Sequence, residues 1–234
     1  MFLDTLTQTL NSSIHRYEHA LQYLKTTRKI SKEEIEKYSL GYGRILHVPD
    51  DGTSDYKKFM EEMWRGKKLE DKIIFPIKDQ MGRVVGVYGR PLDSKLFKTF
   101  ITEEGKYTGF FFGFYQALEA IYRTGRVYVV EGDFDCIALA RVLPNTVASL
   151  TAGLNEQQIL LLQMYCDTIV TVFDSDKTGD FARSELQKKI SIFGKTRLFQ
   201  MNLGYKDPDK CFEILGLDKF KVFINKKLKE STLF

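Results

Sequence analysis

The sequence predicts an α/β protein in which a central, mostly parallel sheet is flanked by helices and preceded by a smaller mixed α/β subdomain. The first observation is that strand and helix patterns alternate between residues 126 and 200, as they do in βαβ units. The second is that these strand patterns are continuous β-branched runs, typical of parallel strands buried on both faces. The third is a hairpin pattern at residues 73–88, which places antiparallel strands before the parallel sheet.

The N-terminal third is expected to begin with helices. Apolar residues at helical spacing would give residues 1–40 one apolar face, formed by Ile14, Tyr17, Leu21 and Leu24. Ser31 and Glu34 have the spacing of a capping box, so a short helix should begin there and end near Gly41 or Gly43. A charged helix around residues 56–64 and a hairpin of strands 73–77 and 83–88, turning at Asp79–Gly82, should follow.

The remaining elements follow from the same periodicities. A helix should run from Phe114 to Arg123 and end at Gly125. The strands expected after it are 127–130, 146–149, 168–173 and 196–200, and the helices are 135–142, 155–164 and 178–190. A short helical tail should start near Asp209. We therefore expect three parts: a basic N-terminal subdomain at 1–125, a catalytic subdomain at 126–205 and a short tail at 206–234.

Composition limits the class of protein. With 234 residues and 43% hydrophobic residues, the chain is long enough and apolar enough to bury a core. A net charge of +4 is compatible with a polyanionic partner without requiring one. The three cysteines stand far apart and include no CxxC pair, so no zinc site is predicted. Isolated thiols and the lack of a signal or membrane-spanning pattern favour a cytoplasmic protein.

Two acidic clusters stand where strand patterns end. Glu131-Gly132-Asp133-Phe134-Asp135 follows the apolar run 127–130, and Asp174-Ser175-Asp176 follows the run 168–173. Ligands bind at the carboxyl ends of strands in open α/β sheets, so these side chains should meet. Gathered carboxylates repel one another unless a cation binds between them, and hard oxygen ligands suit Mg²⁺ or Mn²⁺. The sequence thus predicts a phosphoryl-transfer site.

These patterns resemble a known family. EGDFD after one strand and D-x-D after a later one are similar to the Toprim module of primases, topoisomerases and some nucleases. The blocks IIFPIKDQMGRVVGVYGR, VYVVEGDFDCIALA, VFDSDKTGDFAR and KDPD occur in the order of a bacterial (DnaG-like) primase catalytic core, over roughly residues 20–215. Both a phage replication protein and a core fragment would look like this, because the family's zinc-binding and helicase-binding domains have no counterpart here.

The resemblance assigns roles to individual residues. It implies that Glu131, Asp174 and Asp176 are catalytic and bind metal. Asp135 matches a second acidic position, and Asp207 and Asp209 match a third acidic block, so these three also become metal candidates. Four basic residues would hold template or triphosphate: Arg83, Arg90, Lys98 and, with looser alignment, Lys106. Departures from the pattern are Asp133, where relatives have an apolar or aromatic residue, Ser175 inside the D-x-D, and Thr151-Ala152-Gly153 in place of a Gly-Thr-rich turn.

The implied activity is that of a DNA primase, a nucleotidyltransferase and DNA-directed RNA polymerase that makes short RNA primers. Its implied partners are single-stranded DNA, ribonucleoside triphosphates, and a replicative helicase or a separate zinc-domain or initiation subunit. Two alternatives stay open: a metal-dependent Toprim nuclease and a non-catalytic replisome binding module.

Several single residues have simpler interpretations. Asp133 is expected to be a solvated residue at a helix start, and Asp207 and Asp209 are equally compatible with turn residues. Phe110–Phe112, Phe114 and Tyr115 are expected to pack in the core more than to stack on bases. His15 and His19 are expected to be surface residues without a role.

Overall fold

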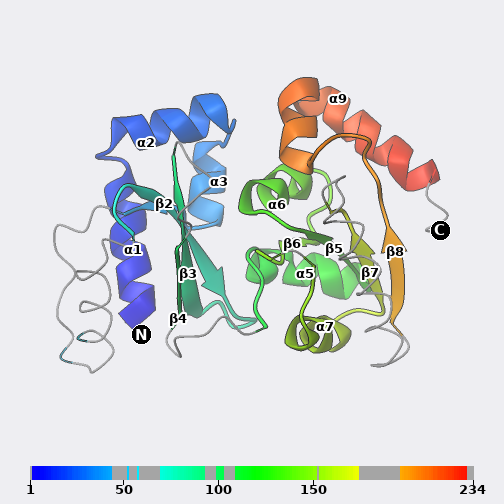
Figure 1. Ribbon diagram of the computed structural model, residues 1–234, viewed down its shortest axis with the longest axis horizontal. Coiled ribbons are helices and arrows are strands. Elements are labelled where there is room, and N and C mark those ends of the chain that lie inside the picture. The colour runs from blue at the N-terminus through cyan, green and yellow to red at the C-terminus, as the bar shows by residue number, and fades with distance from the viewer. Residues whose placement is uncertain are drawn as a thin grey trace. The chain divides into compact units, whose positions relative to one another are not determined.

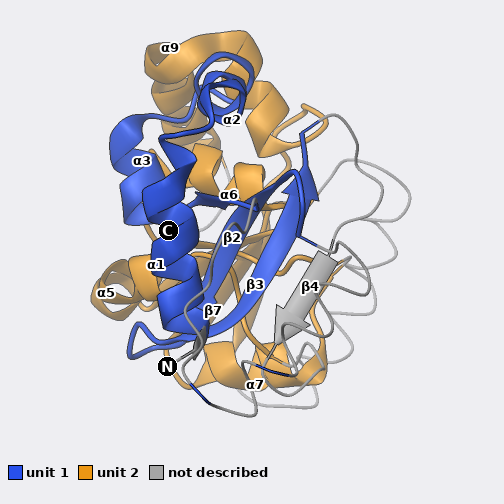
Figure 2. Ribbon diagram, turned by 90° about the vertical axis from the view of Figure 1, so that its left-hand side faces the viewer, with its two compact units in different colours: residues 1–107 blue, residues 108–234 orange. Residues whose placement is uncertain are grey.

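The structure is a computed structural model that describes residues 2–43, 52, 57, 69–92, 99–102, 109–151, 153–173 and 196–230. The chain forms two compact units, residues 1–107 and 108–234 (Figure 2). This division lies earlier than the expected one at 125/126. Helix α5 (Phe114–Thr124) belongs with the second unit, because its buried residues join the core of that unit together with strand β5 (Arg126–Val130).

The first unit is a four-stranded antiparallel sheet with helices (Figure 1). Its helices are α1 (Phe2–Ile14), α2 (Glu18–Gln22), the π-helix η1 (Tyr23–Thr27) and α3 (Lys32–Lys37). Its strands, in spatial order, are β1 (Gly41–Tyr42), β2 (Lys72–Lys78), β3 (Val84–Pro91) and β4 (Thr99–Thr102). Helix α1 packs closely on β1, since a Cβ added at Gly41 would lie 2.8 Å from the Cβ of Leu10.

The sequence-based account of the N-terminal helices is partly wrong. Tyr17 has φ −113° and ψ 82° and stands between α1 and α2, so Ile14 and Leu24 belong to different helices and share no continuous apolar face. The capping box of α3 is confirmed. The Ser31 Oγ accepts from the Glu34 N–H at 3.2 Å, and the Ser31 N–H donates to Glu34 Oε2 at 2.8 Å.

His15 and His19, which were expected to be surface residues without a role, both contact other parts of the first unit. His15 Nε2 lies 3.3 Å from Glu36 Oε1 of α3. His19 Nε2 lies 2.8 Å from the hydroxyl of the buried Tyr42, which donates to Asp71 Oδ1 at 3.0 Å. Both side chains therefore tie the α1–α2 region to other elements of the first unit.

The predicted hairpin is confirmed and is formed by β2 and β3. Gly82 has φ +81° in its turn, a backbone conformation that favours glycine. The expected helix at 178–190 lies outside the described residues, and the one at 56–64 lies almost entirely outside them.

The second unit contains the predicted parallel sheet, in the order β6-β5-β7-β8 (Figure 1). The strands around β5 are β6 (Thr146–Ala148), β7 (Thr168–Thr171) and β8 (Arg197–Gln200). One face carries α5 and α7 (Glu156–Gln163), whose apolar side chains pack with Val127, Val129 and Ile169. The other face carries α6 (Asp133–Ala140) and α9 (Pro208–Glu230), which pack on each other. The α/β fold class is confirmed.

Helix α9 lies within residues 206–234, where a short helical tail was expected. It consists of two helical segments that meet at Gly216, where φ is +70° and ψ is 169°. Among the described residues, no helix is both long enough and apolar enough to cross a membrane.

The phenylalanine cluster lies mainly in the core. Phe111 and Phe114 belong to the apolar core shared by α5, α7 and the sheet, and Phe112 is also fully buried, whereas Tyr115 is 47% exposed. The prediction of core packing is confirmed for these three rings.

Candidate active site

Glu131 follows the last residue of the central strand β5. The chain on either side of it is held to the loop after β6, because the N–H groups of Ser149 and Leu150 donate to the carbonyls of Val130 and Glu131 at 2.9 and 3.0 Å. The Glu131 side chain is half-buried, and its Oε1 is shielded from solvent. A carboxylate held at the carboxyl end of a central parallel strand stands where α/β sheets bind ligands.

Strand β7 runs beside β5 and ends at the same edge. The Val172 N–H donates to the Val129 carbonyl at 2.8 Å, so the chain is still aligned with β5 when it reaches Phe173. Asp174 and Asp176 follow Phe173 in the sequence and lie outside the described residues. Their convergence with Glu131 stays a prediction.

The expectation that Asp133 is a solvated residue is wrong. It is the first residue of α6, as expected of a helix start, but its side chain is fully buried and not solvated. Its Oδ1 accepts from the Phe134 N–H at 2.7 Å. A carboxylate at the first turn of a helix is favoured there by the helix dipole and the exposed N–H groups.

The acidic cluster at 131–135 contacts the acidic residues at the start of α9. The backbone N–H of Asp209 donates to Asp135 Oδ1 at 3.0 Å, across 74 positions of sequence. Asp207 caps α9, since its Oδ1 accepts from the Lys210 N–H at 2.7 Å. Asp207 thus stands at a helix start, and the start of α9 lies against the start of α6.

The donor set can be tested against a divalent cation. The acidic side chains at this edge offer only carboxylate oxygens, which are the ligands that Mg²⁺ and Mn²⁺ prefer. Within the described ranges no group of three acidic, histidine or cysteine side chains is close enough to hold a metal ion. Asp174 and Asp176, the other predicted ligands, lie outside these ranges.

The two expected basic residues that the structure describes, Arg83 and Arg90, lie far apart. Arg83 is 67% exposed and its guanidinium binds the buried Asp79, with Nη2 2.7 Å and Nε 2.8 Å from Oδ2. Arg90 is buried near the other end of β3. Seven residues of strand separate the two by roughly 23 Å, so they cannot hold the same phosphate. Lys98 and Lys106 lie outside the described residues.

One buried cation was missed by the sequence reasoning. Lys72 begins β2 with only 8% of its surface exposed, and burial lowers the pKa of its ammonium group. It is paired with Pro91, while Arg90 is paired with Ile73, so Lys72 and Arg90 point to opposite faces of the sheet. The sequence does not indicate this burial, because a lysine before an apolar strand is usually solvated.

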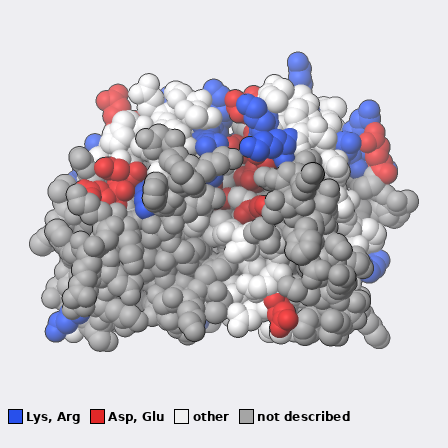
Figure 3. All heavy atoms as spheres, viewed as in Figure 1, with Lys and Arg blue, Asp and Glu red and all other residues white. Residues whose placement is uncertain are grey.

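Described acidic and basic side chains lie close to one another in the upper part of the face shown in Figure 3. Such mixing gives local pairs of opposite sign more than a field of one sign. The described surface in this view therefore adds little to the argument for a polyanionic partner.

Comparison with known proteins matches both units. A model of the DNA primase catalytic core, N-terminal domain, matches residues 6–108, and a Toprim-like model matches residues 128–212. The chain is similar to the DNA primase of Borreliella burgdorferi, with 30% identity over 241 residues that cover 95% of this chain and 46% of that protein. The DNA primase of Synechococcus elongatus is 32% identical over 246 residues, covering 90% of this chain and 34% of the relative.

Solved structures agree on the fold. A structure of the DnaG catalytic core superposes with a TM-score of 0.81 at 23% identity, covering 96% of this chain and 78% of that one. A DnaG primase catalytic domain bound to single-stranded DNA has a TM-score of 0.76 at 24% identity and covers 99% and 84% of the two chains. The chain spans less than half the length of the two relatives named above. Two family models in consecutive order, together with these relatives, show that it belongs to the family of DnaG-type DNA primase catalytic cores with a Toprim-like domain.

Proposed function

We propose that this chain catalyses primer synthesis: it joins ribonucleoside triphosphates into short RNA on a single-stranded DNA template. The observation that carries the proposal is the position of Glu131, a half-buried carboxylate at the carboxyl end of the central strand β5. Nothing in the packing of an apolar sheet requires a carboxylate there, and shielding it from water costs stability. Such a cost is expected at a site that binds a cation and phosphates.

The proposed ligands of the cation are Glu131, Asp174 and Asp176. A bound Mg²⁺ or Mn²⁺ supplies stabilisation of the charge that develops on the attacking and leaving oxygens. Asp207 and Asp209 begin α9 next to Asp135 and are the candidates for a further contact with a cation. The role of the fold is to hold these oxygens in place before substrate arrives.

The proposed substrate contacts involve the first unit. Arg90 and Lys98 are the candidates for template or triphosphate, with Lys106 less closely aligned to the family pattern. An arginine fork binds phosphate oxygens in pairs. Arg83 is a weaker candidate, because Asp79 already binds its guanidinium.

The test is a primer-synthesis assay with ribonucleotides, single-stranded DNA and MgCl₂ or MnCl₂. We expect extension products from the unmodified chain and a loss of about a thousandfold for Glu131→Gln and Asp174→Asn, the scale of several kcal/mol of lost charge stabilisation. The matched control is Asp167→Asn, an exposed carboxylate before β7 at the opposite edge of the sheet, which should keep full activity.

Circular dichroism should show that all three variants fold. Full primer synthesis by Glu131→Gln would overturn the proposal. Degradation of the template without extension would favour the nuclease alternative.

The same assay addresses the partners. We propose that a replicative helicase, or a separate zinc-domain or initiation subunit, directs the chain to its start sites in the cytoplasm. Adding the replicative helicase should raise the yield of primers, and the isolated chain should start with little sequence preference. Strong start-site selection by the chain alone would contradict this part of the proposal.

A further inference from the structure

Asp135 lies between two segments that the proposed site must hold together. Its Oδ1 accepts the N–H of Asp209 at the start of α9. Its Oδ2 lies so close to Gly132 that it would overlap a Cβ on that residue. We infer that Asp135 is a positioning residue that fixes the Glu131–Gly132 turn against α9, and that it is not a ligand of the metal. The inference rests on the proposed function.

The contact explains why a glycine follows Glu131. Gly132 has φ −103° and ψ 158°, an extended conformation that any residue adopts. Its backbone therefore does not call for glycine. A Cβ there would overlap the Asp135 carboxylate, at a separation that real Cβ atoms do not show. A side chain at this position would therefore have to displace the carboxylate of Asp135.

The same contact sets where α9 begins. Asp135 is the third residue of α6, where a carboxylate interacts favourably with the helix dipole, and it also accepts an N–H of the first turn of α9. A second contact joins the two helices, because the guanidinium carbon of Arg141 lies 3.9 Å from the ring centroid of Phe212. These two contacts hold the segment of α9 before Gly216 against α6.

The chemistry of the carboxylate supports a positioning role. A ligand carboxylate would turn its oxygens toward the cation and away from the backbone. Here one oxygen binds an N–H group, and the other lies where it would overlap a Cβ on Gly132. The charge strengthens the bond to the Asp209 N–H, but the bond itself needs only an oxygen acceptor. An asparagine at this position keeps such an acceptor and loses the negative charge that makes a carboxylate the stronger ligand for a divalent cation.

Asp135→Asn and Asp135→Ala separate the two roles. We expect Asp135→Asn to retain primer synthesis within about threefold, and Asp135→Ala to lose about tenfold or more, the factor for one lost hydrogen bond to a charged group. The concentration of MnCl₂ that gives half-maximal activity should be unchanged in Asp135→Asn. An increase of about 10- to 100-fold in that concentration would make Asp135 part of the metal site and overturn the inference.

Hydrogen exchange gives a readout that does not depend on catalysis. The amide of Asp209 should exchange slowly in the unmodified chain and in Asp135→Asn, and fast in Asp135→Ala. Equal exchange at Asp209 in the unmodified chain and in Asp135→Ala would also overturn the inference.

Gly132→Ala tests the space above the turn. Its methyl group should displace the Asp135 carboxylate and speed exchange at Asp209 as Asp135→Ala does. In the double variant, the two losses of activity should not add, because both remove one contact. Additive losses would show that Gly132 acts through something other than Asp135.

The failures of the two proposals are distinguishable. Inactive Glu131→Gln together with a shifted metal requirement in Asp135→Asn would leave the primase proposal standing and remove the positioning role. Active Glu131→Gln would remove the primase proposal, while exchange at Asp209 would still decide whether Asp135 holds α9.

Discussion

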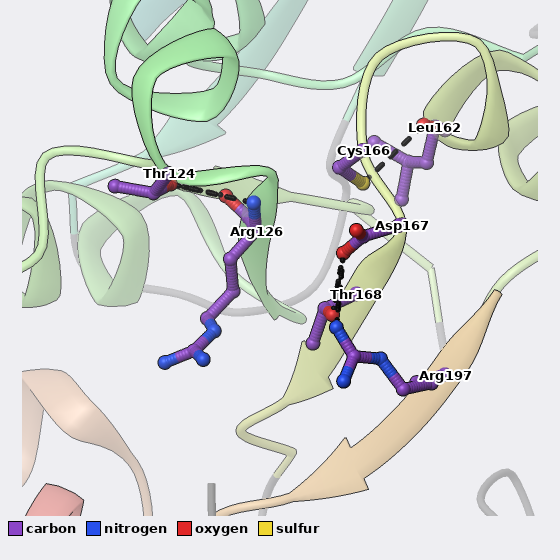
Figure 4. Close-up of polar contacts among 7 residues, drawn as sticks. All are labelled: Thr124, Arg126, Leu162, Cys166, Asp167, Thr168 and Arg197. Carbon is purple, nitrogen blue, oxygen red and sulfur yellow. Dashed lines mark hydrogen bonds and ion pairs between the residues drawn. The ribbon is translucent and has the colours of Figure 1, made fainter. Parts of the chain in front are cut away.

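The two edges of the parallel sheet in the second unit differ in how far their charged groups are buried. At the edge where β7 begins, an ion pair is exposed: Asp167 accepts from the hydroxyl of the buried Thr168 at 2.8 Å and lies 3.5 Å from the Arg197 guanidinium (Figure 4). At the edge where β5 ends, polar groups are buried, among them Asp133 and Gln158. Exposed ion pairs contribute little to stability, whereas buried polar groups must be fully paired. Burial, more than charge, distinguishes the candidate site from an ordinary charged surface.

The largest expected effect concerns two thiols, one near each edge of the sheet, which are both buried. Cys166 precedes Asp167 and Cys211 lies in the first turn of α9, and burial raises the pKa of each thiol from 9.0 to about 12. At pH 8 the thiolate fraction should therefore be about a thousandfold lower than in an unfolded chain. A thiol reagent such as 5,5′-dithiobis(2-nitrobenzoate) should modify both only after unfolding in urea.

The same shift has a consequence for stability. A thiol whose pKa is higher in the folded than in the unfolded state stabilises the fold below about pH 9, and this contribution is lost as pH rises toward 12. Denaturant melts between pH 8 and 11 should show a decreasing free energy of unfolding, with a smaller decrease in Cys166→Ala. Rapid modification of native Cys166 at pH 8 would contradict its burial.

Next in size is the effect of Gln158, a buried amide near the candidate site. Its Nε2 donates to the carbonyls of Phe110 and Ser149, both at 3.1 Å. It also completes a capping box with Asn155 at the start of α7. Gln158→Leu should lower the free energy of unfolding by about 2–4 kcal/mol, because two carbonyls, one of them buried, lose the donor that Gln158 supplies, and α7 loses part of its capping box.

Arg197→Gln at the exposed edge is the matched control for Gln158→Leu. It removes a cation that is 65% exposed and should leave the urea midpoint unchanged. An equal decrease in the free energy of unfolding in Gln158→Leu and Arg197→Gln would contradict the distinction between a buried and an exposed edge.

The sequence predicted the elements well where local rules decide. The apolar strand runs, the α3 capping box and the end of α5 at Gly125, with φ +62°, are all as expected. It did not predict the burial and contacts that depend on packing between distant segments. The burial of Asp133, the contact of Asp135 with Asp209 and the burial of Lys72 depend on elements far apart in the chain. Nor did the sequence predict that the helical tail consists of two segments that meet at Gly216.

The smallest expected effect is at Asp167, where the comparison is sharpest. The hydrogen bond from the Thr168 hydroxyl, aided by Arg197, holds the pKa of the Asp167 carboxyl below its usual range. Thr168→Val should raise that pKa toward its ordinary value, measured by an NMR pH titration of the side-chain carboxyl. A carboxyl whose pKa is lower in the folded than in the unfolded state stabilises the fold above the unfolded-state pKa, and this contribution is lost as pH falls through the folded-state pKa. The free energy of unfolding of the variant should therefore decrease less as the pH is lowered.

Primer synthesis at neutral pH should not change, because Asp167 is ionised in both proteins. A loss of primer synthesis in Thr168→Val, with its fold intact, would mean that this exposed edge also takes part in the reaction.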